Sequence, residues 1–173
     1  MLGVMWQRAT VPMISTRRRI ESATGYLALG LLTEASDELE AIEGDDRLSP
    51  EVMAVRSDLY MEAKQWDLLM AVSRELTRQR PEQIKGWINW AFALRELNRV
   101  AEAKTVLLEA VPIHGEKCGL VNYNLACYCC LLGDQAAAKE WLSRACKMDG
   151  HWKQAALDDK DLKAMWDDIA KMG

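Results

Sequence analysis

The sequence predicts an all-α protein, built as a stack of about four helical hairpins followed by a C-terminal capping helix. Three observations lead to this prediction. Side chains of similar size recur every 34 or 35 positions along most of the chain. Each copy holds two stretches with helical apolar periodicity, separated by a short break. After the last copy, apolar residues recur once more at helical spacing, with charged residues on the other side.

The repeat is clearest where side chains are small. Ala35 is followed in the same register by Leu69, Ala103 and Ala138, at steps of 34, 34 and 35 residues. Small side chains at such positions let two helices approach to about 8–10 Å, as a helical hairpin requires. The other columns in this register are Ala23, Ser57, Ala91 and Ala126; Tyr26, Tyr60, Leu94 and Cys129; Leu39, Ser73, Leu107 and Leu142; and Ile42, Leu76, Ala110 and Ala145.

Glycine and proline mark the breaks between the helical stretches. Gly30 and Gly133 stand where a first helix must turn sharply, and glycine tolerates the positive φ of such turns. Pro50, Pro81 and Pro112 fall between copies, where a missing N–H group and a fixed φ do least harm. We therefore expect a helix to end near each of these positions.

The spacing and the order of small and large side chains resemble the tetratricopeptide repeat (TPR). The residues that carry this resemblance are Trp87, Ala91, Ala103, Leu107 and Ala110 of the third copy, Tyr60 with Pro81 of the second, and Leu125, Ala126, Gly133, Ala138 and Ala145 of the fourth. Lys64 and Leu69 depart from the pattern, which has glycine and alanine there, and Gly115 stands where proline is common. The resemblance covers about residues 15–150 and implies a right-handed superhelical α-solenoid.

This interpretation divides the chain into three parts. Residues 1–14 form an N-terminal segment, and residues 15–150 form four repeats at about 16–49, 50–83, 84–118 and 119–150. Residues 151–173 form the capping helix, because a stack needs a terminal element with one polar side. Asp158 and Asp159 can cap this helix, and its apolar stripe is Leu162, Met165, Trp166 and Ile169. The stretch from Asp159 to Leu162, followed by Trp166, resembles a segment found after the repeats of some bacterial TPR proteins.

In the TPR family, the first helix of each repeat lines a concave groove that binds peptides. The resemblance therefore implies a peptide-binding groove in this chain, formed by Lys85, Asn89, Phe92, Arg95, Tyr123, Asn124 and Cys127. Asn89 and Asn124 occupy equivalent positions, and an amide can bond both the C=O and the N–H of an extended peptide. The same two residues could instead be solvated polar side chains outside the core. Both interpretations stay open at this stage.

One subclass of the family clamps a terminal carboxylate with two lysines, an arginine and two asparagines from three repeats. The present sequence departs from this pattern. It has Ala54, Asp58 and Leu120 at positions where the clamp needs lysine or asparagine. Asp58 would also repel a carboxylate, so we do not expect binding of this kind.

Composition and charge argue against several other classes of function. The 173-residue chain has a formal net charge of −4, which disfavours nucleic-acid binding because affinity for phosphates comes mainly from lysine and arginine. No apolar run approaches the roughly 20 residues that a membrane-spanning helix needs. The first residues do not resemble a signal peptide, so we expect a cytoplasmic protein without membrane contact.

The sequence contains no recognisable motif for catalysis or for binding a cofactor. It contains no glycine-rich phosphate loop, no His-Glu-x-x-His motif and no nucleophile elbow, so we do not expect an enzyme. Cys127 and Cys130 share a helical face, but a closed zinc site needs four ligands, and nothing places His114 or His151 beside them. The five cysteines are odd in number and lie in the last third of the chain, which predicts free thiols and no metal site.

These observations leave two hypotheses for function. The first is a protein–protein interaction module that binds a peptide or a partner helix in the concave groove. The alternative is a homo-oligomeric or structural subunit of a larger assembly, held together by the apolar residues of the N-terminal segment, 1–14. The identity of the partner does not follow from the sequence, because a fold alone does not define specificity.

Overall fold

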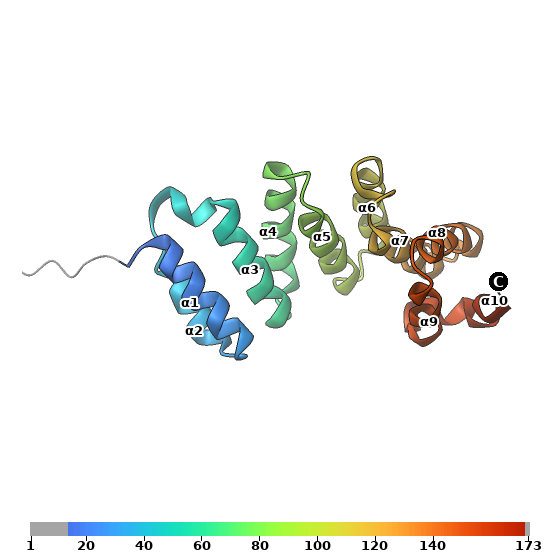
Figure 1. The fold of residues 1–173 in the computed structure, drawn as a ribbon, viewed down its shortest axis with the longest axis horizontal. Helices are drawn as coiled ribbons and strands as arrows, with labels where there is room; N and C mark the ends of the chain where they lie inside the picture. The colour runs from blue at the N-terminus through green and yellow to red at the C-terminus, as the bar shows by residue number, and fades with distance from the viewer. Residues whose placement is uncertain (1–13, 172–173) are drawn as a thin grey trace, which may run out of the picture.

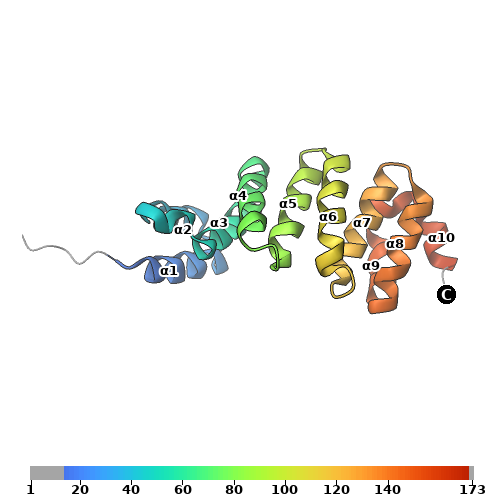
Figure 2. The same cartoon turned by 90° about the horizontal axis from the view of Figure 1, so that it is seen from above.

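The computed structural model describes residues 14–171 and shows a stack of four helical hairpins (Figures 1 and 2). The hairpins are α1 (Thr16–Ala28) with α2 (Leu32–Glu40), α3 (Pro50–Glu62) with α4 (Trp66–Gln79), α5 (Ile84–Glu96) with α6 (Val100–His114), and α7 (Gly119–Leu131) with α8 (Gln135–Met148). A 3₁₀ turn, η1 (Gly44–Leu48), precedes α3. The predicted all-α stack of hairpins is confirmed.

Side-chain caps and proline set several helix starts. Ser15 and Ser49 accept hydrogen bonds from the N–H groups of Arg18 and Val52, which satisfies donors at the starts of α1 and α3. Asp134 caps α8 in the same way. Pro50 is the first residue of α3, where its missing N–H costs nothing because that group has no helical partner.

All four hairpins turn through a residue with positive φ. Gly30 and Gly133 adopt φ values of 73° and 81°, as the sequence predicts. Lys64 and Asn98 occupy the same register and adopt φ values of 54° and 60°, although neither is glycine. Asparagine tolerates this conformation, whereas lysine does not favour it, so at Lys64 the length of the hairpin connection imposes it.

Pro112 does not lie between two repeats, contrary to the sequence-based expectation. It lies inside α6, which continues to His114. The last turn closes because the N–H of Gly115 donates to the carbonyl oxygen of Val111 at 2.8 Å. The N–H groups of Lys117 and Cys118 then bond the carbonyl of His114, so the break between the third and fourth repeats falls after residue 114.

Most of the buried apolar residues within positions 14–171 fall into two clusters. The smaller cluster joins the first two hairpins and includes Ala23, Ala35 and Leu39. The larger cluster joins the last two hairpins and the C-terminal segment, and it includes Leu107 and Leu142. Polar groups lie between the two clusters, since Ser57, Ser73 and Asn89 are all buried where the second and third repeats meet.

The C-terminal segment consists of three short helices where a single capping helix was expected. These are α9 (His151–Asp158), η2 (Lys160–Met165) and α10 (Trp166–Lys171), and we call residues 151–171 the tail. The chain bends after Asp158 because Asp159 accepts the N–H of Asp161, while the indole of Trp166 donates to the carbonyl oxygen of Asp159. The expected apolar stripe is buried nonetheless, since Leu162, Met165 and Ile169 are at most 2% exposed.

The turn residues lead to a prediction about stability. Lys64→Gly should raise the free energy of unfolding by about 0.5–1 kcal/mol, because glycine removes the left-handed penalty at a smaller cost in backbone entropy. The matched change Lys139→Gly, inside α8, should lower it by about 1 kcal/mol. Urea unfolding followed by circular dichroism measures both values. Equal losses of stability in the two variants would contradict this account of the turn.

Candidate functional site on the inner face of the repeats

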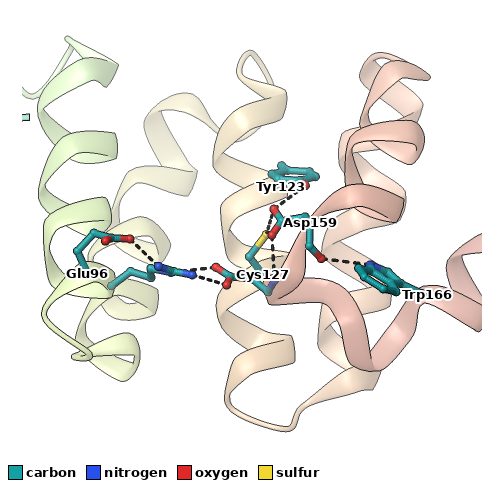
Figure 3. A network of polar contacts seen from close by, with 7 residues as sticks. Glu96, Tyr123, Cys127, Asp159 and Trp166 are labelled. Carbon is teal, nitrogen blue, oxygen red and sulfur yellow. Dashed lines mark hydrogen bonds and ion pairs between the residues drawn. The ribbon is translucent and has the colours of Figure 1, made fainter. Parts of the chain in front are cut away.

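The tail lies against the first helix of the fourth repeat and forms hydrogen bonds with it. The hydroxyl of Tyr123 donates to Asp159 Oδ2 at 2.8 Å, and the thiol of Cys127 donates to the same oxygen at 3.6 Å. Figure 3 shows both side chains of α7 pointing toward Asp159. Two of the predicted groove residues are therefore engaged by the chain itself.

A third predicted residue, Arg95 of α5, binds the tail through a carboxylate. Its Nε donates to Asp161 Oδ2 at 2.9 Å, and a second guanidinium nitrogen donates to Asp161 Oδ1. The remaining terminal nitrogen bonds Glu96 at 2.5 Å. Two parallel bonds between a guanidinium and a carboxylate are strong and directional, so Arg95 ties the tail to the third repeat as well as to the fourth.

The groups that face Asp159 remain protonated. Burial raises the pKa of the Cys127 thiol, and the nearby Asp159 carboxylate raises it further. Burial also raises the pKa of Tyr123, as does the hydrogen bond that its hydroxyl donates to Asp159. Both groups therefore act as donors at neutral pH. A protonated thiol is a poor nucleophile and a poor metal ligand, so the arrangement supports a structural contact.

Asn89 lies in the interior of the protein, which corrects the expectation that it lies outside the core. Its side chain is 8% exposed and donates to Ser57 Oγ at 2.8 Å. Ser57 lies in turn 3.5 Å from the hydroxyl of Ser73. Asn89 thus joins the third repeat to the second through a side-chain hydrogen bond.

Asn124 occupies the equivalent position in the fourth repeat but has a different environment. It is partly exposed, and none of the side-chain hydrogen bonds within residues 14–171 involves it. The reason lies one repeat earlier, where Ala91 stands at the register position that Ser57 holds in the second repeat. Alanine offers no acceptor, so the amide of Asn124 stays available at the surface.

Lys85 and Phe92 complete the set of predicted residues. Lys85 is exposed and forms an ion pair with Asp58 at 2.5 Å, which links α5 to α3. Phe92 is partly buried and meets Trp66 edge to face, with 5.8 Å between the ring centres. We call the surface formed by the predicted groove positions of the first helices the inner face. Outside the tail contacts it comprises Ala54 and Asp58 of α3, Lys85, Ile88 and Phe92 of α5, and Asn124 of α7.

The structure therefore divides the seven predicted residues into three groups. The tail engages Arg95, Tyr123 and Cys127, Asn89 is internal, and Lys85, Phe92 and Asn124 remain at the surface. Sequence reasoning missed the role of the tail acids on this face. Their close spacing is visible in the sequence, but the sequence predicted only a helix cap at Asp158 and Asp159.

Two other predictions concern the N-terminal segment and membrane contact. The apolar N-terminal segment lies almost entirely outside the described residues, so the oligomer contact predicted there stays a prediction. No helix within the described range is both long and apolar enough to cross a membrane.

The fold resembles solved TPR-like structures. No protein-family model and no curated protein matches the sequence. A MamA structure superposes with a TM-score of 0.75 at 12% identity, covering 90% of this chain and 86% of the other. MamA from MSR-1 gives 0.71 at 17% identity, covering 83% and 82%. A thermophilic TPR protein from Thermus thermophilus gives 0.62 at 14% identity, covering 91% and 100%. The chain therefore has a TPR-like α-solenoid fold.

The contact between Arg95 and Asp161 can be tested by substitution. Asp161→Ala should lower the free energy of unfolding by about 1–3 kcal/mol, because Arg95 loses two charge-assisted bonds in a partly buried site. The control Asp168→Ala, at an exposed position in α10, should change stability by no more than about 0.5 kcal/mol. Chemical denaturation of both variants is the measurement. Similar stabilities for the two variants would show that the tail does not depend on this contact.

Proposed function

We propose that the protein is an interaction module that binds a peptide segment or a helix of another protein on its inner face. The tail provides the main support. Arg95, Tyr123 and Cys127 are first-helix positions of this face, and all three hydrogen-bond carboxylates of the tail. An external segment would use the same positions of the preceding repeats.

The exposed part of the inner face has suitable chemistry for such a partner. Phe92 and Ile88 offer apolar contact, and aromatic residues in particular contribute strongly to protein interfaces. Lys85 and Asp58 supply one charge of each sign beside them, and Asn124 adds a free amide. In this proposal Asn89 acts indirectly, by holding the second and third repeats in position.

Site-specific photo-crosslinking tests the proposal. A photo-reactive amino acid replaces Lys85 on the inner face in one variant and Lys139 on the exposed surface of α8 in another. After irradiation in native lysate, the Lys85 variant should yield a discrete crosslinked protein that the Lys139 variant does not. Affinity for a peptide from that protein should fall about tenfold or more on Phe92→Ala, since losing an aromatic anchor typically costs over 1 kcal/mol.

Three outcomes would count against the proposal. Identical products from the two crosslinking positions would indicate non-specific contact. Unchanged affinity in the folded Phe92→Ala variant would place binding on another surface. A crosslink from Lys85 to a second copy of this chain would favour the alternative of a homo-oligomeric subunit.

A further inference from the structure

The outer surface over α4, α5 and α6 contains two adjoining cavities that the repeat pattern does not predict. They measure about 380 and 580 Å³ and share Ala71, Arg74, Trp90 and Glu109 in their walls. The three helices follow one another along the stack (Figure 2). Because the cavities have four lining residues in common, they form one cleft between α4 and α6, which we call the outer cleft.

Trp90 forms the floor of this cleft, and the repeat register explains why the cleft is open here. The equivalent residue of the fourth repeat, Leu125, is fully buried. The equivalent of the second repeat, Arg56, bonds Glu40 and the carbonyl of Leu39. Trp90 instead stays partly exposed and stacks on Trp87, and its indole N–H takes part in none of the hydrogen bonds within residues 14–171. An aromatic ring in this state is an open contact surface.

An uncharged ridge runs along α6 beside the cleft. Its residues are Ala101, Thr105, Leu108 and Pro112, spaced four, three and four apart, and all are exposed. The hydroxyl of Thr105 donates to the carbonyl oxygen of Ala101 at 3.1 Å, so it needs no outside partner, and Leu108 is 42% exposed. These four positions carry no charge over about three helical turns, because the exposed Glu102 and Glu109 of α6 lie on the side that lines the cleft.

The charges around the cleft are arranged in a self-complementary way. Arg74 stands on the α4 wall and Glu109 on the α6 wall, and both are exposed. Neither belongs to an ion pair of the described residues, whereas Arg78 pairs with Glu75 of its own helix and Arg99, the N-cap of α6, pairs with Glu102. If a two-fold axis related two copies across this surface, Arg74 of each copy would lie near Glu109 of the other. The same ion pair would then form twice, once on each side of the axis.

We propose that the outer cleft and the α6 ridge form a symmetric interface between two copies of this chain. The ridge of each copy lies in the cleft of the other, and Arg74 pairs with Glu109 across the axis. The dimensions match, because the cleft follows α4 from Met70 to Arg78 and the ridge offers a similar length, each about two or three turns. This surface is separate from the inner face, so the dimer stands independently of the proposed function.

Sedimentation velocity of the full chain over a range of concentrations tests this interface. The wild type should dimerise. Arg74→Glu and Glu109→Arg should each weaken the dimer at least about tenfold, because each places like charges in contact twice. The double variant should recover association, since the pair then forms with its signs exchanged. Leu108→Asp, which would bury a charge from the ridge, should leave the protein monomeric.

A matched control separates the interface from a general effect of charge. Lys139→Glu makes the same reversal as Arg74→Glu at an exposed site on α8 and should leave the dimer unchanged. Circular dichroism of every variant confirms folding. A wild type that stays monomeric at all concentrations would overturn the proposal. So would a dimer that resists both single reversals, or a double variant that is no more associated than the single ones.

Discussion

The stack depends on close approach between helices at positions where the side chain is small. Ala23, Ala91 and Ala126 on first helices and Ala35, Ala103 and Ala138 on second helices are completely buried. Larger side chains there would push the hairpins apart and lose the packing of the core. The second repeat departs from this pattern, with Ser57 and Leu69 in its two columns, and the apolar core divides next to it. The hydrogen bond from Asn89 to Ser57 crosses this division.

The tail is an integral part of the fold, because its apolar residues are buried as deeply as those of the repeats. Leu162, Met165 and Ile169 would each contribute roughly 1.5–3 kcal/mol through burial, in addition to the polar contacts at Asp159 and Asp161. Removing the tail would therefore open the larger core cluster. The tail thus occupies part of the inner face in the fourth repeat, at Tyr123 and Cys127.

Helix α5 combines several of these roles because its side chains point in different directions around one axis. Asn89 faces the second repeat, Trp90 faces the outer cleft, Phe92 faces Trp66, and Arg95 reaches the tail. The third repeat thus connects the two core clusters and borders both the inner face and the outer cleft. A single substitution in this helix can therefore affect more than one of these contacts.

The sequence by itself determined the repeat register, the hairpins and the turn positions. These depend on local periodicity, and the register extends to Lys64, where residue type alone would not predict a left-handed turn. Only the tertiary structure decided why Asn89 is buried and Asn124 is not, because the difference lies in the neighbouring repeat. It also decided the path of the tail, whose acids meet residues 36 and 66 positions earlier in the chain. A periodic pattern shows which side of a helix is apolar, but the residue that packs against it is set by contacts between distant segments.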